Sequence, residues 1–179
     1  MPVIYTVGHS TRSFDELVEI LRAHGVKRLV DVRTIPRSRH NPQFNRETLS
    51  KALHSRHLCY RHMKALGGLR HSRPDSINTG WHNASFRGFA DYMQTPSFAA
   101  ALESLLRLAE QKPTAIMCAE AVPWRCHRSL IADALTARGY EIRDIMSVTS
   151  AKPHVLTPMA RVRGQRITYP PEGARATKR

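Results

Sequence analysis

Short runs of β-branched and aromatic residues alternate with amphipathic stretches along this chain. Residues 3–7, Val-Ile-Tyr-Thr-Val, are typical of a buried strand, and a second such run covers residues 28–32. Between them, Ser13 and Glu16 predict a capping box at the start of a helix that Gly25 ends. Two strands joined by one helix form a right-handed βαβ unit with parallel strands. This alternation predicts an α/β fold.

The same alternation continues as far as residue 145. Two further helices are predicted at residues 46–56 and 86–93, a third after a cap at Thr95 and a fourth after Cys126. Further strands are predicted at residues 57–62, 115–118 and 141–145. We therefore expect one α/β domain over residues 1–150, with a mostly parallel sheet of about five strands and helices on both faces. Residues 63–84 are predicted to form a long loop, with Trp81 folded into the core. Residues 151–179 are predicted to form a basic, proline-containing tail.

The chain is strongly basic, with 28 Lys and Arg against 14 Asp and Glu and a net charge of +14 in 179 residues. Such a surface favours polyanionic partners, either nucleic acid or another phosphate-bearing ligand. Three cysteines do not make a disulfide framework. Neither a leader nor a long apolar run is present, so we expect a cytoplasmic protein without membrane contact. The sequence leaves the cofactor and the oligomeric state open.

Residues 114–137 combine a short apolar run, a loop and a stretch with helical spacing. The helix is predicted to begin near Cys126, His127 and Arg128. The first turn of a helix has unpaired N–H groups and a partial positive charge, so it attracts anions. In that setting the pKa of a cysteine can fall from about 8.5 to about 3.5–7.5. This segment therefore predicts an anion-binding site with a reactive thiol.

Polar residues follow three of the predicted strands. Because ligands of parallel sheets bind beyond the carboxyl ends of the strands, we expect these residues to meet at one edge. The candidates for proton transfer or nucleophilic attack are Cys126, Cys118, His9 and Glu120. The candidates for binding a phosphate or another anion are Ser10, Arg33, Arg37, Ser38, His127 and Arg128.

Several of these residues also have a purely structural interpretation. Asp31 lies in an apolar run, so we expect an ion pair with an arginine of this edge. Cys118 ends a buried strand, where cysteine often acts as a small hydrophobic residue. This leaves Cys126 as the better candidate for a reactive thiol. Cys118, Cys126, His127 and His9 offer sulfur and nitrogen ligands for zinc, but the two cysteines are eight residues apart, unlike a structural zinc site.

The motifs VGHS, DVRTIPRS, LGG and CAE followed by CHR resemble the bacterial family known as domain of unknown function 488. The resemblance extends from about Ile4 to Ile145 and implies a compact α/β domain without a known activity. The shared polar positions fall on Gly8, His9, Ser10, Asp31, Arg33, Pro36, Ser38, Gly67, Gly68, Cys118, Glu120, Cys126, His127 and Arg128. A weaker likeness links the chain to rhodaneses and cysteine phosphatases, although Cys118 and Arg128 lie farther apart than in their phosphate loop.

Three functions are therefore compatible with the sequence. The first is a thiol-dependent enzyme on a phosphate-bearing or nucleic-acid substrate, with Cys126 or Cys118 as nucleophile and His9 or Glu120 moving protons. The second is a non-catalytic module that binds nucleic acid through basic loops and the tail. The third is a Cys/His metal site. The sequence leaves open whether the protein is an enzyme.

Overall fold

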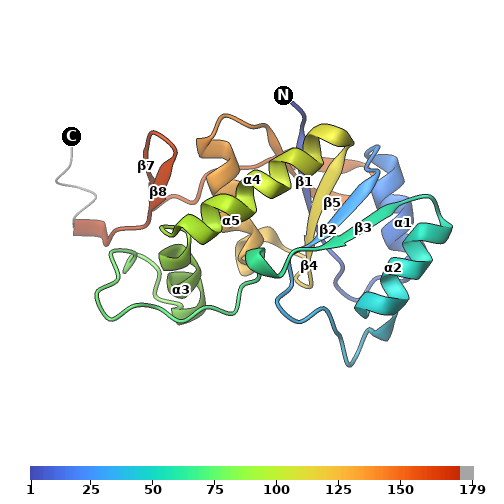
Figure 1. The fold of residues 1–179 in the computed structure, drawn as a ribbon, viewed down its shortest axis with the longest axis horizontal. Coiled ribbons are helices and arrows are strands. Elements are labelled where there is room, and N and C mark those ends of the chain that lie inside the picture. The colour runs from blue at the N-terminus through green and yellow to red at the C-terminus, as the bar shows by residue number, and fades with distance from the viewer. Residues whose placement is uncertain (174–179) are drawn as a thin grey trace.

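Five parallel strands form most of one six-stranded sheet in the computed structural model, which describes residues 1–173 (Figure 1). The strands are β1 (Ile4–Gly8), β2 (Arg28–Asp31), β3 (Cys59–His62), β4 (Thr114–Cys118), β5 (Ile142–Ser147) and β6 (Ser150–Pro153). Their order is β3-β2-β4-β1-β5-β6, and β6 pairs antiparallel with β5 at one edge. The predicted α/β fold is thus confirmed, with one more strand than expected.

Helices cover both faces of this sheet, as predicted (Figure 1). Helices α1 (Phe14–Ala23) and α2 (Arg46–Ser55) pack on one face, and α3 (Ala84–Tyr92), α4 (Pro96–Gln111) and α5 (Arg128–Ala137) pack on the other. Single 3₁₀ turns occur at η1 (Pro42–Phe44), η2 (Lys64–Leu66) and η3 (Pro123–Arg125). Each face has its own hydrophobic core, and the apolar strand β4 between them is buried along its whole length.

The helix caps follow the sequence closely at α1 and α4. Ser13 and Glu16 form the capping box at α1, and the Thr95 side chain accepts from the Phe98 N–H ahead of α4. Asn45 behaves differently, because its side-chain oxygen accepts from the Ser38 N–H and makes no cap on α2. The side chain thus fastens the loop before α2 and leaves the helix end without a side-chain cap.

The carboxyl ends of β1, β2 and β4 meet at one edge of the sheet. Gly8 lies beside Cys118 in the parallel register, and the next N–H along β1, that of His9, donates to the Cys118 carbonyl at 2.9 Å. On the other side of β4, the Val32 N–H donates to the Met117 carbonyl at 3.0 Å. The shared edge predicted from the sequence is present.

Gly8 is required at this edge because the loop after β4 passes directly over it. A Cβ atom at this position would overlap the carbonyl group of Glu120. Glycine therefore allows two backbone segments to approach more closely than any residue with a side chain would permit.

The segment predicted as a C-terminal tail is largely folded onto the domain. Besides β6 it forms a two-stranded hairpin of β7 (Arg161–Arg163) and β8 (Arg166–Thr168), and Tyr169 is fully buried. The Tyr169 hydroxyl donates to Asp133 Oδ2 at 2.7 Å. These contacts join residues far apart in the sequence, which is why local patterns did not reveal them. The end of the predicted tail, residues 174–179, lies outside the described residues.

Most of the predicted loop 63–84 lacks regular structure apart from η2, and one carboxylate organises it. Asp91 of α3 accepts from the Arg73 N–H, the Ser76 hydroxyl and the Asn78 side-chain amide. Trp81 is partly buried against the core, beside Phe86 and Tyr169, as expected. Among residues 1–173, no helix is long and apolar enough to cross a membrane.

Candidate functional site

A pocket of about 340 Å³ lies at the edge where β1, β2 and β4 end. Its walls come from the loops after β2 and β4, from the Gly68 region and from the start of α3. The lining residues are Arg33, Thr34, Ile35, Arg37, Gly68, Leu69, Ser85, Phe86, Cys118, Ala119, Glu120, Arg125, Cys126 and His127. Several of these side chains, including those of Arg37, Leu69 and Arg125, are exposed, so the pocket opens to solvent.

Two cysteines lie side by side in this pocket. Cys118 ends β4, Cys126 precedes α5, and their sulfur atoms are paired as a disulfide. Both residues line the pocket with little of their surface exposed, 2% for Cys118 and 6% for Cys126. The sequence suggested one reactive thiol at Cys126 and a small hydrophobic residue at Cys118. In the fold the two sulfur atoms are bonded to each other instead, because the loop after β4 brings Cys126 back to the end of that strand.

The side chain of Arg128 is completely buried behind the cysteine pair. Its Nη1–H groups donate to Cys118 Sγ at 2.7 Å and to the Glu120 carbonyl, and its Nη2–H donates to the Ala121 carbonyl at 3.1 Å. Burial lowers the pKa of Arg128 to about 10, so the group stays charged at neutral pH. Within residues 1–173 no carboxylate forms an ion pair with it, and its closest sulfur contact is Cys118.

His127 is held in one tautomer. Its Nε2 lies 3.0 Å from the Val32 carbonyl oxygen and 2.9 Å from that of Leu66. Carbonyl oxygens only accept, so Nε2 carries the proton and Nδ1 presents a lone pair. That lone pair lies 3.5 Å from Cys126 Sγ. Burial lowers the pKa of His127 to about 4, and the imidazole is therefore neutral at physiological pH.

Arg33 forms the expected ion pair with Asp31. Its Nε–H and Nη2–H donate to the two carboxylate oxygens at 2.9 and 2.7 Å, and Nη2 also reaches the Phe44 carbonyl. His9 stacks on Phe44, donates from Nδ1 to the Ser10 carbonyl at 2.8 Å, and accepts from Arg33 Nη1 at 3.4 Å. Burial lowers the pKa of His9. These contacts assign His9 and Asp31 to holding Arg33 in place.

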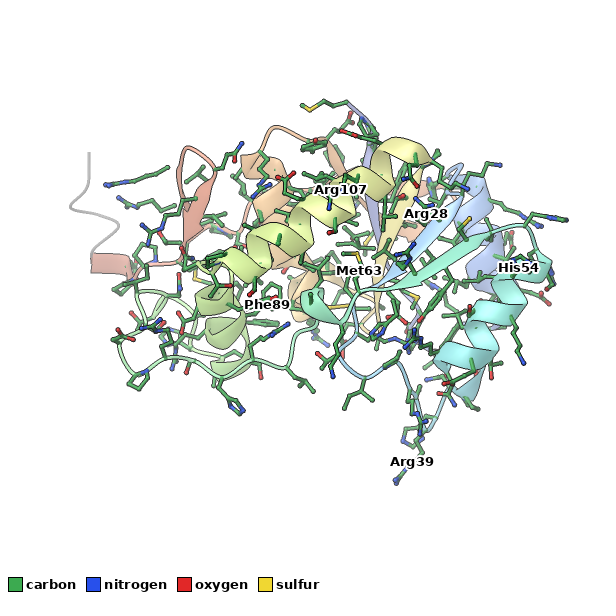
Figure 2. All side chains as sticks on the ribbon, in the orientation of Figure 1. Arg28, Arg39, His54, Met63, Phe89 and Arg107 are labelled. Atoms are coloured by element: carbon green, nitrogen blue, oxygen red, sulfur yellow. A yellow bond between two sulfur atoms is a disulfide. The ribbon has the colours of Figure 1, made fainter. Side chains whose placement is uncertain are left out.

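The mouth of the pocket carries charge that is not neutralised internally. Arg37 and Arg125 are exposed, and among the described residues neither guanidinium has a hydrogen bond or an ion pair. Figure 2 shows the neighbouring Arg39 pointing away from the body of the protein at the tip of the loop after β2. Glu120 is exposed at the same mouth. The cationic mouth is suited to an anionic ligand.

Apolar side chains at the mouth were not expected from the sequence. Ile35 and Leu69 are 61% and 66% exposed, and Phe86 completes this wall. Arg125 was also missed. It directly precedes the CHR motif, so its position was the one available signal. For the apolar residues the sequence offered none, since an exposed Leu or Ile looks like any other apolar residue in a loop.

The pocket thus unites some of the predicted site residues and leaves others out. Cys118, Cys126, Glu120, Arg33, Arg37 and His127 line it, whereas His9, Ser10, Ser38 and Arg128 do not. The Ser38 hydroxyl accepts from the Asn41 N–H, and the Ser10 N–H donates to the Ala119 carbonyl. Both serines therefore support the loops around the pocket. In the described part of the chain, no group of three or more His, Cys, Asp or Glu side chains is arranged to hold a metal ion.

Comparison with known proteins agrees with the motifs around this pocket. The profile of the family described as "Domain of unknown function DUF488" matches residues 13–135. The chain belongs to the DUF488 family. No curated protein matches it, and no solved structure does. In this DUF488 protein, the matched residues include both cysteines, Arg128 and every residue that lines the pocket.

Proposed function

We propose that this DUF488 protein is a thiol-dependent enzyme that acts on a phosphate-bearing or similarly anionic substrate in the cysteine pocket. The observation that carries the proposal is the contact of 2.7 Å between Arg128 Nη1 and Cys118 Sγ. A buried guanidinium is costly without an anionic partner. When the disulfide is reduced, a thiolate at Cys118 supplies that partner.

The contacts around the two sulfurs favour different protonation states once the pair is reduced. Cys118 receives a hydrogen bond from a full positive charge, which stabilises the thiolate. Cys126 faces the unprotonated Nδ1 of His127, which accepts a hydrogen bond from a thiol, and its sulfur receives only an uncharged donor, the Arg128 backbone N–H at 3.4 Å. We therefore assign the nucleophile to Cys118. Cys126 acts as the second thiol, which pairs with Cys118 in the oxidised state.

The arginines at the mouth hold the substrate anion in this proposal. Arg37 and Arg125 line the pocket, and within residues 1–173 their guanidinium groups have no hydrogen-bond or ion-pair partner, so they can match phosphate oxygens in a bidentate manner. The Cys118 sulfur attacks the electrophilic phosphorus, and the leaving oxygen departs with its electron pair and takes up a proton from solvent. Water then displaces the sulfur as a thiolate, and the Glu120 carboxylate accepts the proton of that water. The reducing cytoplasm expected from the sequence keeps the two thiols available.

Alkylation of the reduced protein tests the assignment of the nucleophile. Mass spectrometry after iodoacetamide treatment between pH 4 and pH 9 measures the rate at each cysteine. We expect Cys118 to reach half its maximal rate below about pH 7, and Cys126 only above about pH 8. Arg128→Met should move the Cys118 profile upward, while Cys126→Ser should leave it in place.

Circular dichroism of each variant provides the folding control for this experiment. The pH profile of Cys118 alkylation in Cys126→Ser tests the assignment of the nucleophile even if Arg128→Met does not fold. A Cys118 profile like that of free cysteine, or a low-pH profile at Cys126, would refute the assignment.

Protection from alkylation tests the anion site separately. Millimolar inorganic phosphate is expected to slow alkylation of Cys118 in the reduced protein, because a bound anion covers the sulfur and competes electrostatically with its thiolate. The double variant Arg37→Gln/Arg125→Gln should lose this protection. The matched variant Lys51→Gln/Arg107→Gln, which removes two exposed charges on α2 and α4, should retain it. Equal protection in both variants would exclude the arginines of the mouth as the anion site.

A further inference from the structure

A second pocket, of about 200 Å³, lies on the β7–β8 hairpin and shares no lining residue with the cysteine pocket. Figure 1 shows this hairpin at the opposite end of the molecule from α1 and α2. The pocket is lined by Ile77, Arg161, Arg163, Arg166, Thr168 and Pro170. Half of these residues are arginines, so the composition of the pocket favours an anion.

The register of the hairpin places all three arginines on the same face. Arg161 pairs with Thr168, and Arg163 pairs with Arg166. Side chains alternate between the two faces of a strand, so the intervening pair, Val162 and Ile167, points to the other side. Ile167 is 4% exposed and belongs to the hydrophobic core. The buried face thus fixes which side of the hairpin presents the arginines.

Two of these arginines form a like-charged pair directly across the strands. Such pairs destabilise a sheet unless an opposite charge lies nearby. Within residues 1–173, neither Arg163 nor Arg166 forms an ion pair. The Arg166 Nε–H donates to the neutral Oε1 of Gln94 at 3.1 Å. An anionic ligand would supply the opposite charge that this pair lacks within residues 1–173.

The hairpin is firmly anchored to the domain, which makes it a defined binding surface. The Gln94 side-chain amide donates to the Ile167 carbonyl at 2.8 Å. The Tyr169 N–H donates to Asn78 Oδ1 at 2.9 Å, and the Gly80 N–H donates to the Tyr169 carbonyl at 2.9 Å. Gly164 supplies the positive φ of 61° in the turn between the strands.

We propose that the β7–β8 hairpin binds the phosphodiester backbone of nucleic acid. Arg161 and Arg163 lie two residues, or about 7 Å, apart along β7, and Arg166 lies opposite Arg163 on β8. The arginine face is therefore longer than one phosphate group needs, and neighbouring phosphates of one nucleic-acid strand fill it better than a single phosphate does. Contacts of this kind position a protein on nucleic acid without reading its sequence. The site does not depend on the chemistry proposed for the cysteine pocket.

Fluorescence anisotropy with the full chain and a labelled single-stranded oligonucleotide tests this site. We expect Arg163→Gln/Arg166→Gln to weaken binding severalfold. The slope of log affinity against log salt should become shallower by about 1.4, because each phosphate contact on a single strand contributes about 0.7. Arg163→Lys/Arg166→Lys keeps the charge and should keep most of the slope. Lys51→Gln/Arg107→Gln, which removes the same charge elsewhere, is the matched control.

Two outcomes would overturn the proposal. The first is the same affinity and salt slope in the hairpin variant and the matched control, since the binding would then follow net charge alone. The second is competition by inorganic phosphate or a nucleoside monophosphate as effective, per phosphate, as competition by the unlabelled oligonucleotide. That result would assign the pocket to a free phosphate.

The unfolding temperature separates a binding role from a structural one. Arg163→Thr removes one of the two opposing charges, so we expect the free protein to keep or raise its unfolding temperature while it binds the oligonucleotide less tightly. A lower unfolding temperature together with unchanged binding would contradict the proposal.

Discussion

At the level of single residues, the site depends on groups that lie behind the pocket as much as on those that line it. Arg128 has no exposed surface, yet its guanidinium contacts Cys118 Sγ and the carbonyls of the loop after β4. Asp31 and His9 likewise do not line the pocket, but they contact Arg33 and hold it in place. The sequence proposed Arg128 as a direct anion ligand. In the structure Arg128 does not line the pocket, and its buried guanidinium contacts Cys118 Sγ from the protein side.

Gly68 controls the position of His127. A Cβ atom at Gly68 would lie 2.6 Å from Nδ1 and 2.8 Å from Cγ of the imidazole. We expect Gly68→Ala to push the ring away from Cys126 and from the carbonyls of Val32 and Leu66, at a cost of about 1–3 kcal/mol. Urea denaturation measures this loss.

Gly173→Ala is the matched control for that substitution, because nothing lies within 4 Å of a Cβ atom there. If Gly68→Ala were as stable as Gly173→Ala, the close packing of His127 against the loop would be refuted.

At the level of secondary structure elements, one histidine joins three segments that the sequence did not connect. His154 follows β6 and lies between Asp144 of β5, at 2.9 Å, and Asp133 of α5, at 2.8 Å. Asp133 also accepts from Tyr169 after β8, and Asp144 accepts from Thr6 of β1. This buried network explains why the C-terminal segment, as far as residue 173, is folded onto the domain and does not form a tail.

The stability of the protein should depend on the charge of His154. Burial by itself lowers its pKa, but hydrogen bonds with Asp133 and Asp144 and their charges raise it to about 9. Because the folded pKa lies above the value of about 6.5 in the unfolded chain, the stabilisation is complete below pH 6.5 and is lost as the pH rises through 9. We expect a loss of up to about 3 kcal/mol over this interval.

Denaturation of the wild type and of His154→Gln at a series of pH values checks this dependence. The difference in unfolding free energy between the two proteins should shrink between pH 6.5 and pH 9. A difference that stays constant over that range would show that His154 does not carry the charge in the folded state.

At the level of the whole molecule, arginines line two separate pockets. One is the mouth of the cysteine pocket, with Arg37 and Arg125, and the other is the arginine face of the β7–β8 hairpin. The net charge of +14 indicated a polyanionic partner but no location. The two alkylation experiments and the oligonucleotide experiment address the two sites independently, so either proposal can fail without the other.

The sequence by itself determined the α/β fold, the capping box at Ser13 and the edge of the sheet at which His9, Arg33 and Cys118 lie. These features depend on local patterns and on the rule that parallel strands end at one edge. Only the tertiary structure decided that Cys118 pairs with Cys126, that Arg128 is buried behind them and that the C-terminal segment folds back as a hairpin. Those outcomes depend on contacts between distant residues, and burial, which sets the role of a charged side chain, is a property of the packed molecule alone.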